Sequence, residues 1–195
     1  MRPWGIIGAI AALLAPQVIA QPNRSDSSPL ASERRGPPMH GSIAEDFYNQ
    51  GYTQFSHGDF VAAIESYTAA LAANPDLAEA YNNRCLTRVI LGKDIPQARA
   101  DCQEAAIRLP NRPDIRETLG FVHLKLDEPS LALAEYDSAL KINPERPIAL
   151  YGRALAKQRL GDINGARADR AAALRLQPSI DRKSTRLNSS HVSES

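Results

Sequence analysis

Apolar and small residues recur three and four positions apart between residues 44 and 180, and the same pattern is written four times. In each copy an alanine is followed twelve residues later by a proline, in the pairs Ala63 and Pro75, Ala98 and Pro110, Ala132 and Pro144, and Ala166 and Pro178. This spacing puts the apolar residues on one face of a helix, which the proline then ends. We therefore expect a helix between each alanine and the proline that follows it.

A turn signal stands just before each of these alanines, at Gly58-Asp59, Gly92-Lys93-Asp94, Asp127-Glu128-Pro129 and Gly161-Asp162. A second helical pattern precedes each turn, so the unit reads as helix, turn, helix and proline stop. Each first helix carries a small residue, Gly51, Cys85, Gly120 or Ala154, where we expect it to meet the alanine of its partner helix. Small residues there let the two backbones approach closely.

The prolines recur every 34 or 35 residues, and alanines and aromatic residues recur at fixed positions before them. In this period and in these residues the chain resembles an array of four tetratricopeptide repeats. The resemblance implies an all-α fold, a right-handed superhelical array of four helix-turn-helix repeats with eight antiparallel helices. We expect the repeats at 44–77, 78–112, 113–146 and 147–180. Two departures are that Cys102 and Arg170 stand where Tyr67 and Tyr136 stand in the other copies.

Residues 1–20 have the features of a signal peptide: a positive charge at Arg2, an apolar run from Trp4 to Leu14, and small or β-branched residues before Gln21. An uncleaved membrane anchor is the alternative, but the run is shorter than the ~20 residues that a spanning helix needs. The proline- and serine-rich stretch 21–43 predicts a disordered tether. We therefore expect an exported protein, periplasmic or secreted.

The last fifteen residues, 181–195, change character at Asp181. Over 181–191 the chain resembles the in-frame translation of a common sequencing adapter, which predicts an artefact. The alternative is a basic, serine-rich disordered tail. Within the fourth repeat, the charged Arg167, Arg170 and Arg175 predict that the array ends there or continues with one polar helix.

Charge gives no reason to expect nucleic acid or a membrane surface as the partner. Setting aside Arg2 and the tail's Arg182, Lys183 and Arg186 leaves 19 of the 23 Lys and Arg. Setting aside Asp181 and Glu194 in the same way leaves 20 of the 22 Asp and Glu, for a net charge of −1. No basic stripe accompanies the repeats, so we expect no nucleic-acid binding.

Two cysteines, Cys85 and Cys102, stand on the two helices of the second repeat, seventeen residues apart. An oxidising compartment would allow a disulfide bond between them. Against the bond, simple antiparallel pairing places Cys85 nearest Ala98 and about one turn from Cys102. Both interpretations, a disulfide and two small core residues, stay open.

No residue pattern predicts catalysis, a metal site or a cofactor. The histidines, of which His123 lies on a first helix, share no helical face at metal-ligand spacing, and the cysteines lack the close spacing of a zinc site. No glycine-rich phosphate loop follows a strand. We expect no enzyme activity in residues 44–180.

In the family's architecture the first helices line a concave groove, so the resemblance places a peptide-binding surface on them. Carried onto this sequence, the groove residues are Tyr48, Asn49, Tyr52, Asn82, Asn83, Leu86, Glu117, Thr118, Phe121, Tyr151, Gly152 and Leu155. Asparagine amides can hydrogen-bond an extended peptide, and aromatic and leucine side chains give it apolar area. The alternative is that the apolar members only complete packing between neighbouring helices.

A clamp for a terminal carboxylate, shared by repeats that bind chaperones, is not predicted here. The clamp uses lysine, asparagine, asparagine, lysine and arginine, and only Asn83 matches. Tyr48, Tyr52, Asp114 and Thr118 stand at the other positions, and an acidic residue would repel a carboxylate.

Together these observations predict a non-catalytic scaffold that binds a protein or peptide. Two alternatives remain: the repeats could belong to a longer, truncated enzyme such as a protease or glycosyl transferase, or they could form a homo-oligomer through the exposed terminal repeat. The oligomeric state and the partner are not specified by the sequence.

Overall fold

The structure, a computed structural model, describes residues 42–180, in which eight α-helices and no strands occur. In chain order the helices are α2 (Ile43–His57), α3 (Phe60–Ala73), α4 (Ala78–Leu91), α5 (Ile95–Arg108), α6 (Pro113–Lys125), α7 (Pro129–Ile142), α8 (Pro147–Arg159) and α9 (Ile163–Leu176). This confirms the all-α fold of four helix pairs. The expected signal peptide 1–20 and the tail 181–195 lie outside the described residues, as does the expected tether up to residue 41. The last two residues of that expected tether belong to the start of α2, where Ser42 is the N-cap and Ile43 the first helical residue.

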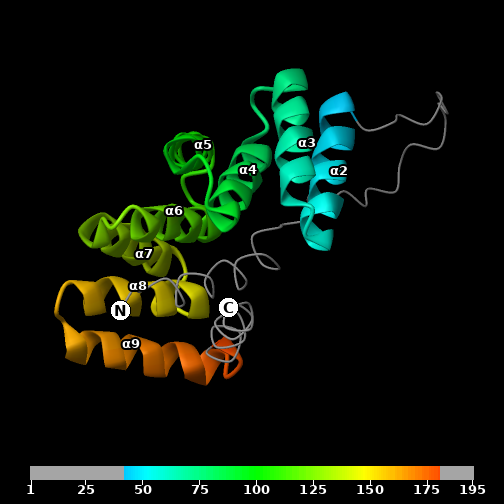
Figure 1. Cartoon of the computed structure of the whole chain (residues 1–195). Coiled ribbons are helices and arrows are strands. Elements are labelled where there is room, and N and C mark those ends of the chain that lie inside the picture. Colours follow the sequence, from blue (N-terminus) through cyan, green and yellow to red (C-terminus); the bar gives the residue numbers. More distant parts are fainter. Residues whose placement is uncertain (1–41, 181–195) are drawn as a thin grey trace, which may run out of the picture.

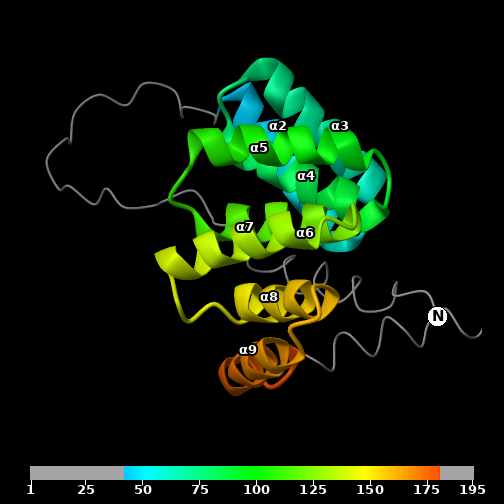
Figure 2. The same ribbon diagram turned by 90° about the vertical axis from the view of Figure 1, so that its left-hand side faces the viewer.

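The helix pairs follow one another as a stack, with α6 and α7 between the pairs on either side (Figures 1 and 2). The even-numbered helices contact one another in succession, α2 with α4, α4 with α6, and α6 with α8. Each odd-numbered helix packs on the even-numbered helix before it and, where one follows, on the even-numbered helix after it. We call α2, α4, α6 and α8 the inner layer, and α3, α5, α7 and α9 the outer layer.

Local sequence sets where the helices begin and end. Ser42 caps α2 through a capping box with Glu45, and prolines stand in the first turns of α5, α6, α7 and α8, where no backbone N–H is needed. The turn inside each repeat uses a left-handed residue at one position of the unit: Gly58, Gly92, Asp127 and Gly161, with φ of 86°, 70°, 58° and 88°. Glycine adopts this conformation without steric cost, so at this position only the third repeat uses a strained residue.

The two helices of a repeat meet through a small residue and a ring. A Cβ added to Gly51 would lie 2.8 Å from the ring of Tyr67, and one added to Gly120 would lie 2.9 Å from Tyr136. Both tyrosines are fully buried. Tyr136 also contacts the next repeat, because a Cβ added to Gly152 on α8 would lie 2.2 Å from its Cζ atom. Glycine is therefore required on both sides of this ring.

Cys85 on α4 and Cys102 on α5 form a disulfide bond, with 5.5 Å between their Cα atoms. The expectation that Cys85 would lie about a turn away from Cys102 is wrong. The helices cross so that the first-helix small residue faces the position of Tyr67 and Tyr136, and in the second repeat Cys102 holds that position. Both cysteines are fully buried.

Candidate protein-binding surface

The predicted groove residues lie on the four inner-layer helices, and most of their side chains are buried. Asn49 is exposed, and Tyr52 and Leu155 are half-buried. The others are buried in the structure: Tyr48, Asn82, Asn83, Leu86, Glu117, Thr118, Phe121, Tyr151 and Gly152. The assignment of these residues to peptide binding stays a prediction, and their contacts are described below.

Tyr48 and Asn83 join the first two repeats. The side-chain amide of Asn83 on α4 donates a hydrogen bond of 3.1 Å to the Tyr48 hydroxyl on α2. Burial raises the pKa of Tyr48 to about 12. The hydroxyl of this tyrosine therefore has a partner within the array.

Glu117, predicted to face the groove, is fully buried and paired with Arg146, which the sequence did not single out. The Arg146 guanidinium donates to both carboxylate oxygens, at 2.9 and 2.5 Å. Burial raises the pKa of Glu117, although Arg146 opposes that shift. Arg146 is the N-cap residue of α8, so the pair holds the start of α8 against α6 and Glu117 already has a structural role.

Thr118 and Phe121, also on α6, have neighbours on the same helix. The Thr118 hydroxyl donates to the Asp114 carbonyl at 3.0 Å. The Lys125 ammonium lies 5.6 Å from the centre of the Phe121 ring, and burial lowers the pKa of Lys125.

Asn82 differs from the residues at the same position of the other repeats. In the first and third repeats the position is held by Tyr48 and Glu117, whose side chains have the partners described above. Asn82 is 2% exposed, and its Oδ1 atom accepts no hydrogen bond from any residue that the structure describes. A buried acceptor left without a donor costs about 1–3 kcal/mol, so any N–H that reached this atom would be stabilising.

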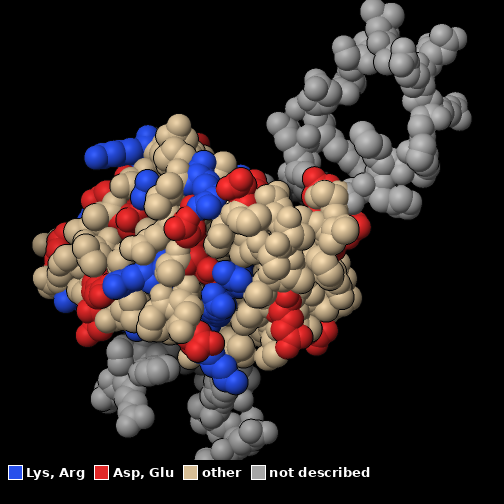
Figure 3. All heavy atoms as spheres, turned by 90° about the horizontal axis from the view of Figure 1, so that it is seen from above, with Lys and Arg blue, Asp and Glu red and all other residues tan. Residues whose placement is uncertain are grey.

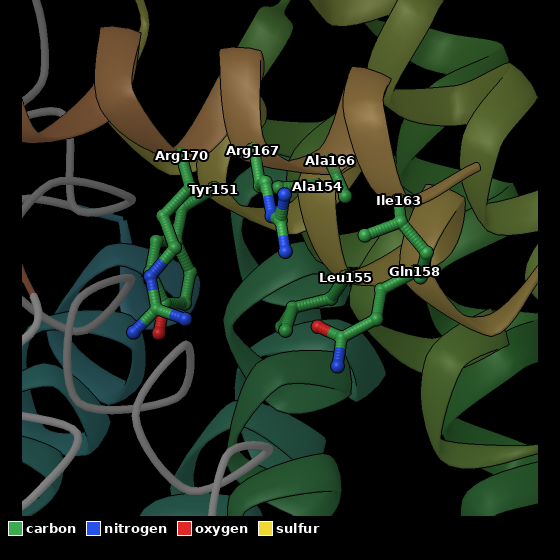
Figure 4. A pocket seen from close by; sticks show the side chains of 8 residues that line it. All are labelled: Tyr151, Ala154, Leu155, Gln158, Ile163, Ala166, Arg167 and Arg170. Atoms are coloured by element: carbon green, nitrogen blue, oxygen red, sulfur yellow. The ribbon is translucent and has the colours of Figure 1, made fainter. Parts of the chain in front are cut away.

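A pocket of about 260 Å³ opens between α8 and α9. Its apolar lining comes from Ala154, Leu155, Ile163 and Ala166, with Tyr151, Gln158, Arg167 and Arg170 completing it. Tyr151 and Arg170 lie side by side (Figure 4), with the guanidinium carbon 5.8 Å from the ring centre. Two predicted groove residues, Tyr151 and Leu155, thus line a cavity.

Two clusters of ion pairs join the helices of the second and fourth repeats, and they were not predicted from the sequence. In the second repeat Arg84 donates two hydrogen bonds to Asp101, at 2.9 and 2.6 Å, and Arg88 contacts the same carboxylate. The fourth repeat contains the same arrangement, formed by Arg153, Lys157 and Asp169. The signal was present, since an arginine precedes an aspartate by 17 and 16 residues in these two repeats.

Charges of both signs are mixed on the face seen from above in Figure 3, where Lys and Arg lie next to Asp and Glu. Within residues 42–180 no group of three or more His, Cys, Asp and Glu side chains could hold a metal ion. None of the helices in that range is both long enough and apolar enough to cross a bilayer.

Comparison with known proteins assigns the helical part of the chain to one family. The family model described as "Tetratricopeptide repeat" matches residues 48–113 and 118–179. Human "Protein O-mannosyl-transferase TMTC3" is 30% identical over 103 residues, which is 52% of this chain and 11% of that protein. The chain spans between 11% and 61% of the length of this and other curated relatives.

Solved structures share the fold at low sequence identity. A thermophilic repeat protein of Thermus thermophilus, TTC0263, superposes with a TM-score of 0.66 at 22% identity, covering 76% of this chain and 82% of that one. The first repeat domain of Spaghetti (RPAP3), bound to the HSP90 peptide SRMEEVD, superposes with a TM-score of 0.60 at 22% identity, covering 65% and 99%.

Proposed function

Because the chain belongs to the tetratricopeptide-repeat family, we propose that it is a non-catalytic scaffold whose inner layer binds a protein or an extended peptide. The observation that carries this proposal is the buried Oδ1 atom of Asn82, which has no hydrogen-bond donor in the described part of the chain. Because Asn82 is 2% exposed, neighbouring side chains must move aside before a backbone N–H of a bound peptide can supply that donor. The likeness to a repeat domain bound to an HSP90 peptide supports a peptide as the ligand class.

The test separates binding from folding by comparing two neighbouring asparagines. Peptides selected from a random library displayed on phage would be synthesised, and their affinity for the full chain would be measured by calorimetry. Asn82→Leu should weaken binding at least tenfold without lowering stability, because it removes an unpartnered acceptor. Asn83→Leu, the matched control, should lower stability, because it removes the hydrogen bond to Tyr48.

Two results would refute the proposal. One is a failure to select any peptide that binds the folded chain. The other is a selected peptide whose affinity is the same for the parent and for Asn82→Leu, since the inner-layer amide would then play no part. Ile107→Ala, on an exposed outer-layer side chain, is expected to leave affinity unchanged.

We further propose that the protein acts outside the cytoplasm, in the cell envelope or after secretion. The signal-peptide pattern of residues 1–20 supports this, and so does the Cys85–Cys102 disulfide, because disulfides persist in oxidising compartments. A fusion of residues 1–41 to a phosphatase that is active only after export should give activity. A fusion lacking residues 4–14 should give none, and equal activity in both would contradict export.

A longer enzyme that carries these repeats is the second candidate, favoured by the likeness to part of a protein named as an O-mannosyl-transferase. Long-read sequencing of the locus across the codons for Pro178 to Ser195 separates the candidates. A downstream catalytic domain would favour the enzyme, and a stop codon soon after Ile180 would favour the scaffold.

A further inference from the structure

The exposed side of α2 repeats a row of residues on α4, one of which, Asn83, bonds to the first repeat. Glu45, Asn49 and Thr53 of α2 stand 34 residues before Glu79, Asn83 and Thr87 of α4, and the three residue types are identical. Their local geometry is also repeated: Thr53 donates to the Asn49 carbonyl at 3.0 Å, and Thr87 donates to the Asn83 carbonyl at 2.6 Å. We call Glu45, Asn49 and Thr53 the head face.

The two copies of this row differ in what covers them. In α4, Asn83 and Thr87 are buried, Glu79 is half-buried, and Asn83 donates to Tyr48 of the preceding repeat. In α2 no repeat precedes the row among the described residues, and Glu45, Asn49 and Thr53 are all exposed. Among the described residues, α2 thus presents a face that resembles the buried row of α4 and that no other repeat covers.

The opposite end of the array offers the matching surface. Tyr151 holds in the fourth repeat the position that Tyr48 holds in the first, and it lines the α8–α9 pocket together with Leu155 and Ala166. In the third repeat the positions equivalent to Leu155 and Ala166, held by Phe121 and Ala132, are fully buried, and α8 packs on that repeat. We call the pocket residues of α8 and α9 the tail face.

Charge also matches between the two ends. The head face begins in the first turn of α2, which carries Glu45 and Asp46, both exposed. The tail face carries Arg167 and Arg170. Acidic side chains brought against these arginines would be favoured, whereas two tail faces placed together would repel each other.

We propose that the head face of one copy docks on the tail face of a second copy, as α4 docks on the first repeat within one chain. The partner for the pocket is therefore α2 of another molecule of this protein. Such a head-to-tail contact uses different surfaces on the two copies, so it adds molecules in an open series unless the rotation closes a ring.

Two variants, each altered at one end, test the orientation of the contact. Asn49→Arg places a cation on the exposed head face, where it would oppose the arginines of the tail face. Ile163→Glu places an anion on an exposed side chain of the tail face, where it would oppose Glu45 and Asp46 of the head face. Sedimentation velocity of the full chain over a concentration series should show association of the parent. Each variant alone should associate at least tenfold more weakly, while an equimolar mixture should form a dimer and nothing larger, because one intact head and one intact tail remain.

The control is Ile107→Arg, which replaces an exposed isoleucine of α5 and should associate like the parent. Far-ultraviolet circular dichroism should give the same helix content for all three variants. A parent that stays monomeric throughout the series overturns the proposal and leaves the tail face to residues beyond Ile180 or to a different protein. Association that survives both variants, or a mixture that stays monomeric, overturns it as well.

Discussion

Cys85 and Cys102 hold, in the second repeat, the two positions that Gly120 and Tyr136 hold in the third. In the third repeat a glycine makes room for a large ring, and in the second a covalent bond joins two side chains across the same gap, with 5.5 Å between Cα atoms. Both solutions fill the space between the helices of one repeat. The departure of each residue from the repeat pattern is therefore explained by the other.

This exchange predicts how the second repeat responds to loss of the bond. Cys85→Ala with Cys102→Ala should lower the free energy of unfolding by about 3 kcal/mol, the chain-entropy value for a loop of this length. The pair Cys85→Gly with Cys102→Tyr should recover part of that loss, because it restores the glycine and ring of the other repeats. Urea titration of the parent and both variants measures these differences.

Reduction of the disulfide provides the control for that prediction. Dithiothreitol should lower the stability of the parent and leave both double variants unchanged. If the parent shows equal unfolding midpoints in oxidising and reducing buffer, the bond does not contribute to stability.

Gly152 should tolerate no larger residue, because it faces Tyr136 across the repeat boundary. Alanine is the better helix former by about 1 kcal/mol, but its Cβ would lie 2.2 Å from an atom of a fully buried ring. We expect steric conflict to win and Gly152→Ala to lower the free energy of unfolding by about 1–3 kcal/mol. Thermal unfolding followed by circular dichroism measures the change.

Gly165→Ala is the matched control for this prediction. Its Cβ would meet the Asp162 carboxylate at 2.1 Å, but that side chain is exposed and can move, losing at most its cap bond from the Gly165 N–H. A cap is worth about 1 kcal/mol, which the better helix propensity of alanine offsets. A loss of stability as large as that of Gly152→Ala would show that helix geometry, and not the ring, requires glycine.

The period of the sequence was sufficient to predict the fold, but the register between paired helices was not. Spacing along each helix identified the alanines that became buried, Ala63, Ala98 and Ala132. It could not show that Cys85 faces Cys102, because that depends on the angle at which two helices cross. The pairing of Glu117 with Arg146 likewise depends on where the N-cap of α8 lies relative to α6.

The sequence also could not predict which buried polar side chains have hydrogen-bond partners. Asn82 and Asn83 are adjacent and chemically identical, yet Asn83 bonds to Tyr48 and the Asn82 acceptor has no partner in the described region. Only the three-dimensional arrangement separates them. Repeat position alone places both asparagines on one predicted surface.

Removing the hydroxyl should lower stability at Tyr48 but not at Tyr136. Tyr48→Phe loses the bond from Asn83 and should cost about 0.5–1.5 kcal/mol of stability. Tyr136→Phe removes a buried hydroxyl that has no hydrogen-bond partner in residues 42–180, and it should be neutral or stabilising. Chemical denaturation of the two variants side by side gives the comparison, and equal losses would contradict it.

Because the pKa of Tyr48 is raised, the free energy of unfolding should depend on pH in the alkaline range. The folded hydroxyl titrates near 12 and the unfolded one near its ordinary value of 10.0, so above pH 10 the unfolded state loses its proton first. The contribution of Tyr48 to stability is therefore complete below pH 10 and declines up to about pH 12. In Tyr48→Phe this decline should be smaller.

Asp169 should contribute to stability at neutral pH and lose that contribution in acid. Burial raises its pKa, but hydrogen bonds from Arg153 and Lys157 outweigh that effect, and the net pKa is lowered. The stabilisation is therefore present above the pKa of the unfolded state and is lost as pH falls through the folded value. Asp169→Asn should cost about 1–2 kcal/mol at pH 7, less than a fully buried pair because Arg153 is partly exposed.

The pH profile distinguishes this ion pair from simple packing. The difference in stability between the parent and Asp169→Asn should shrink as the pH falls through the acid range. A difference that is independent of pH would show that the asparagine disturbs packing and that the charge has no part.

Asp127 is one of two non-glycine residues with a left-handed backbone in residues 42–180, the other being Asp94, and replacing Asp127 should stabilise the third repeat. Its φ of 58° is left-handed, where the other three repeats have glycine, and a side chain in that region costs about 1 kcal/mol. Its ion pair with Arg159, at 3.3 Å, offsets little, because the Asp127 side chain is 89% exposed and Arg159 also donates to the Leu124 carbonyl. Asp127→Gly should therefore raise the melting temperature, and Asp127→Ala, which keeps the strain and loses the ion pair, should lower it. If both variants melted below the parent by the same amount, the ion pair and not the backbone would govern this turn.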